Sequence, residues 1–458
     1  MPKEAKQADA DNQAALPRTG RVARGAIAGM AVARVGLAQL GHKAKSLTRT
    51  EAAAAPAQAA HEAELGRILF AAFNQLKGTA LKASQLLSLE LGLLPEGLRQ
   101  QLARAHYQVT PLNRALVIKV LRQEFGPGFD QGPQRLFQHF EPQAFAAASL
   151  GQVHAATLAN GEAVAVKLQY PGMAASMTSD MRMLRSLVQT LAGPLAGGVD
   201  ALPSALVIER VLADIELKLA EELDYVHEAQ ALQWFGQHLT LPGLVIPQAV
   251  TACSTRSVLT MQRLQGLHVA EWLQTQPSQS TRDHYGQLLF DTFMHCAFAL
   301  RHVQADPHPG NYLFMPDGQL GLLDFGCTRK LSSAFCASIQ TAWSACLRSP
   351  ADAVALLEAY RSIGLVSPGM TEQDFCTQLM PALADLHTWQ LLPFTQVIYD
   401  FAQHPPYPPR SPAHQRVAMQ CLQSVPADLP YFDRAHLGLV QLLRTLGARV
   451  RTANPWIG

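Results

Sequence analysis

The sequence predicts an α+β chain of two lobes, in which a small lobe with β-strands precedes a helical lobe, and a helical extension precedes both. Three observations support this class. Residues 139–172 contain short apolar runs that alternate with polar residues, as strands do. Residues 61–106 and 173–236 have leucines at helical spacing with few helix breakers. From residue 280 onward the pattern is again mainly helical.

The composition fits a folded chain of several domains. At 458 residues, with 48% hydrophobic and 16% charged side chains, the chain is long enough for two or three domains with large cores. A net charge of +2 gives no reason to expect nucleic-acid binding. The seven cysteines are scattered without zinc-ligand spacing, which indicates reduced, mostly buried thiols in a cytosol-like compartment.

The N-terminal residues predict a basic arm followed by a linker. Residues 12–50 hold seven basic side chains and no acid. Within them, Arg34 lies near the centre of an Ala- and Gly-rich stretch and would cost about 2.5–3.5 kcal/mol inside a bilayer, which disfavours a membrane-spanning helix. The favoured interpretation is a basic helix on an anionic membrane surface, with a solvated arm and an organellar transit peptide as alternatives. Residues 51–60, EAAAAPAQAA, are typical of a linker.

Turn signals organise the middle of the chain. Asn160 and Gly161 separate two apolar runs, which predicts a β-hairpin. Residues 125–134 are rich in Gly and Pro and predict a loop, and residues 243–263 predict a second pair of strands. The expected domains are the arm and linker at 1–60, a helical extension at 61–135, the small lobe at 136–264 and the helical lobe at 265–458.

The segment 305–326, ADPHPGNYLFMPDGQLGLLDFG, predicts a site for a metal ion and phosphate. Two apolar runs joined by a turn predict a hairpin that returns Asp324 to the side of Asn311. Amide and carboxylate oxygens are ligands of a hard cation such as Mg²⁺, and Asp306 would receive a proton or orient a nucleophile. The spacing, with Asn five and Asp eighteen residues after Asp306, matches the protein-kinase catalytic loop and D-F-G. For D-F-G alone, a proline-rich turn with capping side chains is the simpler alternative.

The remaining parts of such a site lie upstream in the expected order. Lys167 ends an alternating apolar run after the hairpin and would hold the α- and β-phosphates by its charge. Glu222, Asp224 and Glu228 follow on a helical segment, and one or two of them are expected to face the site. A generic acidic face of a helix is the alternative for these three residues.

An alanine-rich loop replaces the glycine-rich loop of protein kinases. It consists of Ala146, Ala147, Ala148 and Ser149. Because alanine allows fewer backbone angles than glycine, this loop is expected to hold phosphates differently and to move less.

Six segments, in order, resemble the UbiB family of atypical kinases, bacterial and organellar proteins linked to ubiquinone biosynthesis. They are LKASQLLS, AAASLGQVH, VAVKLQYPG, EELDYVHEA, ADPHPGN and LLDFG, between about residues 70 and 330. The resemblance implies a bilobal protein-kinase-like fold that binds ATP or ADP with Mg²⁺. It also implies that Lys167 is the strand lysine, Glu228 its partner, Asp306 the catalytic aspartate, Asn311 and Asp324 the magnesium ligands, and Ala146–Ser149 the nucleotide loop.

The same resemblance implies a regulatory plug. Lys82 and Gln85 match the family's K-x-G-Q element, a helical extension thought to lie across the active site and to restrict access for large substrates. Glu222 and Asp224 fall on the family's E-x-D pair and would give Lys82 charged partners. Ser84 stands where the family has glycine, which favours the helix by a few tenths of a kcal/mol and adds bulk where the element would meet the nucleotide loop.

The resemblance implies Mg-dependent ATP hydrolysis, or phosphotransfer to a small molecule or lipid, in support of ubiquinone biosynthesis or lipid handling. The expected partners are a nucleotide, an anionic or quinone-precursor lipid surface and proteins of a biosynthetic complex, with no nucleic acid. The expected location is cytoplasmic and peripheral on the inner membrane of a bacterium, rather than organellar.

Two rival functions remain open. A protein Ser/Thr kinase is disfavoured by the alanine-rich loop, by the plug and by the absence of A-P-E after D-F-G in the sequence. A nucleotide-sensing scaffold that recruits partners remains open, because binding and catalysis would use the same residues.

Overall fold

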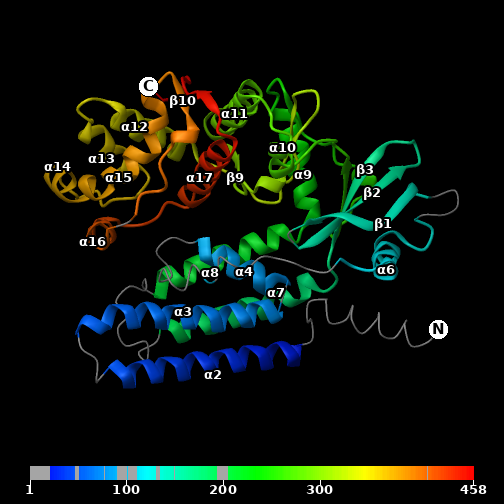
Figure 1. Ribbon diagram of the computed structural model, residues 1–458, viewed down its shortest axis with the longest axis horizontal. Helices are drawn as coiled ribbons and strands as arrows, with labels where there is room; N and C mark the ends of the chain where they lie inside the picture. The colour runs from blue at the N-terminus through cyan, green and yellow to red at the C-terminus, as the bar shows by residue number, and fades with distance from the viewer. Residues whose placement is uncertain are drawn as a thin grey trace. The chain divides into compact units, whose positions relative to one another are not determined.

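The computed structural model describes residues 21–46, 51–76, 78–89, 101, 111–129, 135–148, 150–192, 205–409 and 411–457. The chain divides into two compact units, Met1–Ala229 with Ala249–Arg263, and Gln230–Gln248 with Leu264–Gly458. In its described part, the first unit holds a helical bundle and a four-stranded sheet, and the second is mainly helical with three small sheets (Figure 1). This is the α+β class that the sequence predicts.

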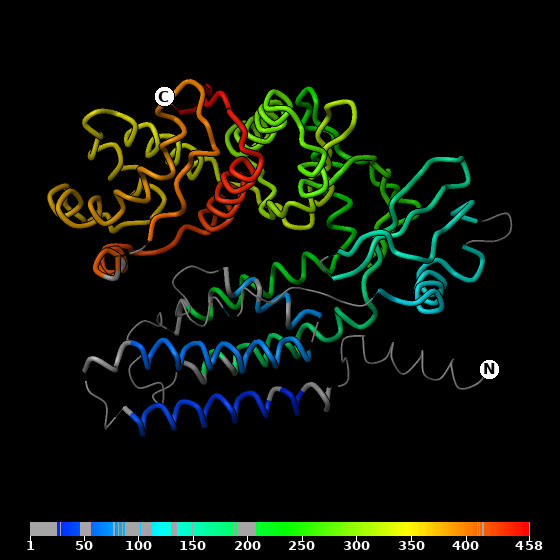
Figure 2. Tube along the Cα trace, viewed as in Figure 1, coloured from blue at the N-terminus to red at the C-terminus, as the bar shows by residue number. Residues whose placement is uncertain are grey.

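Five helices of the first unit pack as a bundle around one apolar core, and their traces can be followed in Figure 2. They are α2 (Arg21–Ser46), α3 (Glu51–Leu76), α4 (Gly78–Leu89), α7 (Met173–Ala192) and α8 (Ala205–Glu222). Helix α2 buries Ile27, Ala31 and Val35, which recur every four residues, and packs against α3 and α7. The predicted basic helix is therefore part of the bundle and is not a solvated arm. No helix in the described ranges is long and apolar enough to cross a membrane.

Residues 51–60 form the first part of α3, so the prediction of a linker was wrong. Alanine has the highest helix propensity of all residues, and eight of these ten residues are alanine or glutamate, which favour the helix. Pro56 is the sixth residue of the helix, where its missing N–H removes one backbone hydrogen bond. The alanine content thus outweighs the single breaker.

The first unit also contains an antiparallel sheet in the order β1-β2-β3-β5. Its strands are β1 (Phe137–Ala148), β2 (Gly151–Leu158), β3 (Ala163–Gln169) and β5 (Val258–Gln262), and α6 (Arg114–Phe125) packs on its core side. The turn from β2 to β3 contains Gly161 at φ 88°, which confirms the predicted hairpin. On β3, Val164, Val166 and Leu168 join the core, and Lys167 alternates with them to the opposite face.

The second strand pair predicted within residues 243–263 does not form as such. Strand β4 (Leu244–Val245) pairs in parallel with β8 (Leu320–Leu322) in the second unit, whereas β5 pairs with β3 in the first. A single bridge joins Ala249 to Met261. Pro247 lacks the N–H that a continuous ladder needs, so the two apolar runs join different sheets.

The second unit surrounds a short β-structure with helices. Its α-helices are the end of α9 (Tyr225–His238), α10 (Val269–Gln274), α11 (Gln279–Met294), α12 (Ser333–Leu347), α13 (Ala353–Ser362), the short α14 (Glu372–Asp374), α15 (Met380–Leu391), α16 (Pro412–Cys421) and α17 (Leu429–Leu446). Its other strands are β6 (His302–Gln304), β7 (Tyr312–Phe314), β9 (Thr328–Lys330), β10 (Ile398–Asp400) and β11 (Arg449–Arg451). Helix α17 packs on α11 and on β6, so a C-terminal element supports the strand that leads to Asp306.

Candidate active site

In the first unit, Lys167 on β3 forms a buried ion pair with Glu228 on α9. The lysine Nζ lies 2.8 Å from Oε1 and 2.9 Å from Oε2 of the glutamate, and the two side chains are 9% and 2% exposed. Tyr225, in the first turn of α9, places its ring centroid 5.0 Å from the same Nζ. Both contacts favour the charged amine, so the first unit holds one lysine cation in a defined position.

The alanine-rich segment ends in a tight turn between β1 and β2. Ala146–Ala148 end β1, and the last of them pairs with Gly151, whereas Ser149 lies outside the described residues. A Cβ on Gly151 would lie 2.1 Å from the carbonyl oxygen of Leu168 and 3.1 Å from the Tyr225 hydroxyl. Only glycine therefore fits at this position, which the sequence analysis did not single out.

A second ion pair ties the helical extension to the end of α8. The Nζ of Lys82 on α4 lies 2.8 Å from Oε1 of Glu222, and these side chains are 11% and 14% exposed. Ser84, on the same helix, is fully buried, so its hydroxymethyl group is accommodated within the bundle. Gln85 belongs to α4, but its side chain lies outside the described part of the structure.

Asp224 lies between two helices, where the sequence predicted one helical segment. Helix α8 ends at Glu222 and α9 begins at Tyr225. The Oδ1 of Asp224 accepts hydrogen bonds from the N–H groups of Val226 and His227, and its Oδ2 lies 3.7 Å from the Arg256 Nε. Asp224 thus caps α9, the helix that carries Glu228.

In the second unit, a hairpin brings Asn311 and Asp324 together, as predicted. Tyr312 pairs with Leu322 across β7 and β8, and the next N–H, of Leu323, donates to the Asn311 carbonyl over 2.9 Å. Asp324 follows directly. The described residues contain no cluster of three His, Cys, Asp or Glu side chains that could hold a metal. One amide and one carboxylate fit a magnesium ion whose other ligands are phosphate and water oxygens.

Gln304 links the backbone at Asp306, in the predicted catalytic loop (Asp306–Asn311), to the backbone at Asp324 of D-F-G. Its Nε2 donates to the carbonyl oxygen of Asp306 over 3.1 Å and to that of Asp324 over 3.0 Å. The Nδ2 of Asn311 donates to the same Asp306 carbonyl over 2.8 Å. Gln304 stands two residues before Asp306, the position of histidine in the kinase H-R-D motif. The sequence analysis missed it because one neutral side chain carries no charge signal.

The Asp306 carboxylate forms an ion pair with a residue of the C-terminal helix. The Nη2 of Arg434 on α17 lies 2.7 Å from its Oδ1, and the side chains of Arg434 and Asp306 are 22% and 24% exposed. The two residues are separated by 128 positions. No local pattern in the sequence could have connected them.

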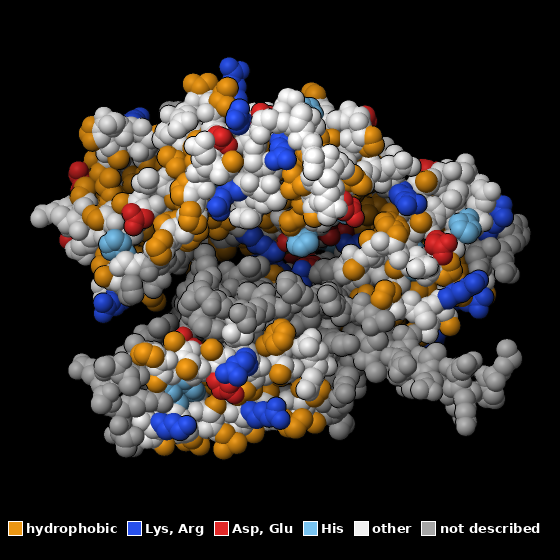
Figure 3. Space-filling model, viewed as in Figure 1, with side chains coloured by type: hydrophobic (Ala, Val, Ile, Leu, Met, Phe, Trp, Pro, Cys, Tyr) orange, Lys and Arg blue, Asp and Glu red, His pale blue; other side chains and the backbone are white. Residues whose placement is uncertain are grey.

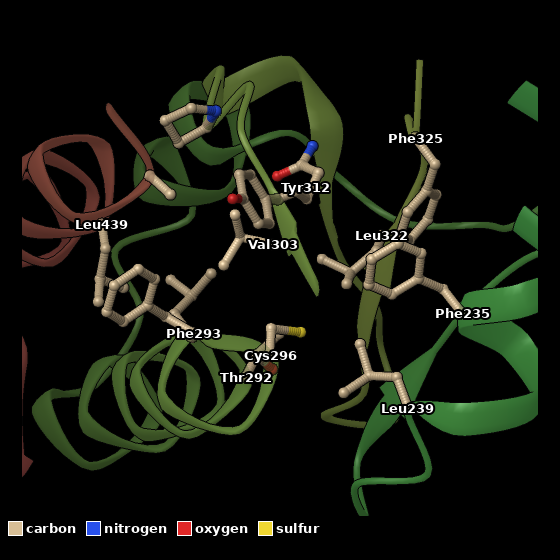
Figure 4. A pocket seen from close by; sticks show the side chains of 14 residues that line it. Phe235, Leu239, Thr292, Phe293, Cys296, Val303, Tyr312, Leu322, Phe325 and Leu439 are labelled. Atoms are coloured by element: carbon tan, nitrogen blue, oxygen red, sulfur yellow. The ribbon is translucent and has the colours of Figure 1, made fainter. Parts of the chain in front are cut away.

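A narrow apolar pocket lies behind the catalytic loop within the second unit (Figure 4). Phe325, the middle residue of D-F-G, is fully buried and lines it together with Phe235, whose ring centroid is 4.7 Å away. Its volume of about 40 Å³ suits a few water molecules and not a nucleotide. Burial raises the pKa of the Cys296 thiol, which lines the pocket, to about 12. Burial, and then the Asp306 charge, raise the pKa of the Tyr312 hydroxyl.

Together the fold and these residues define a protein-kinase-like protein, with a lysine–glutamate pair on a sheet-containing unit and a catalytic loop with D-F-G on a helical one. The solved complex of Rv3197 with erythromycin from Mycobacterium tuberculosis has this fold. It matches 85% of this chain and 93% of its own chain with a TM-score of 0.59 at 24% identity.

The family follows from the sequence comparison. The ABC1 atypical kinase-like domain matches residues 104–357, more than half of the chain. The chain therefore belongs to this family, the UbiB family of atypical kinases.

Curated proteins that this chain is similar to are also named atypical kinases. The mitochondrial atypical kinase COQ8 of Saccharomyces cerevisiae is 30% identical over 266 residues, 57% of this chain and 50% of the yeast protein. The mitochondrial atypical kinase COQ8B of Rattus norvegicus is 32% identical over 266 residues, 57% of this chain and 47% of the rat protein. The chain thus spans about half the length of the curated relatives it matches.

Proposed function

We propose that this chain binds ATP or ADP with Mg²⁺ and catalyses ATP hydrolysis, or phosphotransfer to a small molecule or lipid, in support of ubiquinone biosynthesis or lipid handling. The observation that carries the proposal is the buried pair of Lys167 and Glu228, with side chains 9% and 2% exposed. Taking two ions out of water costs several kcal/mol for each ion, so a buried pair is weak as a device for stability. Membership of an atypical kinase family supports a catalytic use of the lysine.

In this proposal each site residue has one task. Lys167 holds phosphate oxygens by its charge, and Ala146–Ala148 line the nucleotide loop together with Ser149. Asn311 and Asp324 would hold the magnesium ion, which supplies neutralisation of phosphate charge when bound. Asp306 orients the attacking oxygen and accepts its proton. The residues contribute mainly position and charge.

The docked helical extension supports a small or lipid acceptor. The ion pair of Lys82 and Glu222 joins α4 to the end of α8, and its side chains are only 11% and 14% exposed, so moving α4 away would leave a mostly buried charge without its partner. In the proposal, α4 with Gln85 limits access for folded protein substrates, which disfavours a protein Ser/Thr kinase.

The outer face of α2 supports a membrane partner. Met30, Leu37 and Leu40 are 55%, 69% and 51% exposed and recur at helical spacing. The helix contains no acidic residue. Among its described side chains, the exposed basic residues are Arg34, Lys43 and Lys45. Figure 3 shows hydrophobic and basic side chains side by side on the bundle, at the bottom of the view. An apolar stripe with basic flanks is typical of a helix that lies on an anionic lipid surface.

The nucleotide part is tested with purified full-length protein and the variant Asp324→Asn. We expect wild type to bind Mg-ADP in calorimetry and to release phosphate from ATP, and the variant to lose at least about 100-fold in turnover. Chelation of Mg²⁺ should have the same effect on wild type. Asp317→Asn is the matched control, since Asp317 is exposed and caps the turn of the same hairpin. Binding without turnover in wild type would favour the nucleotide-sensing scaffold, and no binding would contradict the proposal.

The pathway part needs a separate test. A strain that lacks this gene should have lowered ubiquinone, which lipid extraction and mass spectrometry would measure, and the wild-type gene should restore it. Unchanged quinone levels would separate the protein from ubiquinone biosynthesis, whatever its nucleotide chemistry.

A further inference from the structure

Helix α17 lies in direct contact with the catalytic loop. A Cβ on Gly438 would lie 1.9 Å from Cγ and 2.4 Å from Cβ of Pro307, the residue after Asp306. Helix and loop are therefore closer at this point than any side chain larger than glycine allows. The sequence pattern of α17, a strongly amphipathic helix, does not by itself indicate this contact.

Arg434 lies one turn before Gly438 and faces the same loop. Its Nη2 donates to Oδ1 of Asp306 over 2.7 Å, a charge-assisted bond between two partly buried groups. Other bonds fix the Asp306 backbone, since its carbonyl oxygen accepts from the side-chain amides of Gln304 and Asn311. The bond from Arg434 is thus the one among these that holds the carboxylate itself.

The start of α17 is anchored to the segment that follows D-F-G. The Oδ2 of Asp428 accepts from the Ser332 N–H over 2.9 Å, and its Oδ1 lies 3.4 Å from the Arg329 Nε. The guanidinium of Arg329 also lies 5.0 Å from the ring centroid of Tyr431. One helix therefore contacts both the segment that carries Asp306 and the segment that follows D-F-G. These contacts fix the position of α17 along its axis, and with it the position of Arg434.

We propose that Arg434 is a positioning residue for Asp306: by holding Oδ1 it fixes the direction in which the carboxylate accepts the proton of the attacking oxygen. This inference rests on the proposed function, since it assigns a task at the same site. A charged donor on a helix restricts the rotation of a carboxylate that would otherwise turn about its own side-chain bonds. Arg434 acts through Asp306 and not on the nucleotide. It therefore affects the chemical step and not nucleotide binding.

The test compares steady-state kinetics of ATP hydrolysis in full-length wild type, Arg434→Gln and Arg434→Lys. We expect Arg434→Gln to lower kcat by about 10- to 100-fold with KM for ATP and Kd for Mg-ADP nearly unchanged, since misplacement of a catalytic group reduces the rate by such factors. Lysine keeps the charge and should restore part of the rate. Arg449→Gln, which removes an exposed ion pair with Asp400 in the same unit, is the control and should leave kcat unchanged.

A double variant separates positioning from a structural role. If Arg434 acts through Asp306, adding Arg434→Gln to Asp306→Asn should not lower the residual rate further. A purely structural residue would lower the rate in both backgrounds and would also lower the unfolding temperature, and that result would overturn the inference. An unchanged kcat in Arg434→Gln, or a rise in KM and Kd, would overturn it as well. Wild type without turnover would instead remove the proposed function, and this inference with it.

Discussion

At the scale of single residues, the buried pair of Lys167 and Glu228 makes a prediction about stability. Lys167→Met leaves the Glu228 carboxylate, at 2% exposure, without its cation, and should lower the free energy of unfolding by about 3–5 kcal/mol. The double variant Lys167→Met/Glu228→Met should recover most of that loss, because a hydrophobic pair of similar volume needs no desolvation of charge. Denaturant unfolding measures both.

The control for this prediction is Arg67→Gln in the same unit. Arg67 pairs with Glu64 at the surface, with side chains 64% and 45% exposed, so its loss should change stability by no more than about 1 kcal/mol. A double variant that is no more stable than Lys167→Met would show that the loss does not come from an isolated buried charge.

Buried histidines make a prediction about pH. Burial, and then the charge of His404, lower the pKa of His436 to about 3, and burial, then Arg444, lower the pKa of His404 to about 4. His436 lies among aromatic rings, including those of Phe293 and Phe432. Unfolded histidine titrates near 6.5, so below that pH the unfolded chain binds more protons than the folded chain. The free energy of unfolding should fall as the pH drops below about 6.5, by up to about 1.4 kcal/mol per pH unit for each histidine.

Denaturant unfolding of the second unit between about pH 7 and pH 5 measures this loss. In His436→Phe the free energy of unfolding should fall less steeply as the pH drops, because phenylalanine has no proton to gain. Above the pKa of histidine in the unfolded chain, the free energy of unfolding of this variant should differ less from that of wild type. His227→Gln, at an exposed position on α9, should keep the wild-type slope. Equal slopes in wild type and His436→Phe would contradict the role of His436.

At the scale of elements, the contact of α17 with the catalytic loop can be tested at Gly438. Gly438→Ala places a Cβ 1.9 Å from Cγ of Pro307, so the helix or the loop must move. We expect a loss of about 1–3 kcal/mol from overpacking, against a gain of about 1 kcal/mol from helix propensity, and a lower turnover because Asp306 moves. Unfolding measurements and ATP hydrolysis together give both effects.

Gly236→Ala on α9 is the matched control. It is also a helical glycine, but its Cβ would meet no atom within 4 Å. This variant should be as stable as wild type or more stable by up to about 1 kcal/mol, with unchanged turnover. If Gly438→Ala behaved in the same way, the contact between α17 and Pro307 would not be tight in solution.

The elements that the sequence predicts correctly are those determined by neighbouring residues. The hairpin at Gly161 and the one between β7 and β8 each depend on a turn of a few residues between two apolar runs. The pairing of β4 was not predicted, since its partner β8 lies far along the chain and an apolar strand can join either sheet. The linker prediction for residues 51–60 was wrong because the helix propensity of the alanines outweighs the effect of the single proline.

The same distinction applies to the candidate site. The spacing along the chain predicts Asp306, Asn311 and Asp324 as site residues, because one hairpin determines how close together they lie. Gly151 is required by a contact with β3, and Arg434 reaches Asp306 from a helix 128 residues away. Such contacts depend on tertiary packing, which leaves no periodic or local signal in a single sequence.

At the scale of the whole molecule, the proposed site residues are distributed over both compact units. The first unit holds the pair of Lys167 and Glu228, and the second holds Asp306, Asn311 and Asp324. The division between the units falls between Ala229 and Gln230, within the residues of α9. The two core clusters of the first unit share no residue with the large core cluster of the second, so each set of residues can be tested by substitutions that leave the other unit's core intact.

The position of α2 decides how membrane binding should be tested. Ile27 and Val35 belong to the bundle core, so removal of residues 1–50 would expose that core and confuse loss of binding with loss of folding. Substitution of the outer stripe avoids this problem. Met30, Leu37 and Leu40 are each more than half exposed, so changing all three to serine should leave the stability of the bundle nearly unchanged.

In co-sedimentation with vesicles of anionic phospholipid, we expect wild type to bind, to bind less at high salt, and to bind vesicles of neutral phospholipid weakly. The salt effect follows because Lys and Arg attract the anionic surface only over the Debye length. The variant Met30→Ser/Leu37→Ser/Leu40→Ser should lose most of the binding, since burial of such side chains contributes about 1.5–3 kcal/mol each. Val397→Ser is the matched control, since Val397 is 66% exposed and lies in the second unit. Equal sedimentation of the triple variant and wild type would mean that α2 is not the membrane-binding surface.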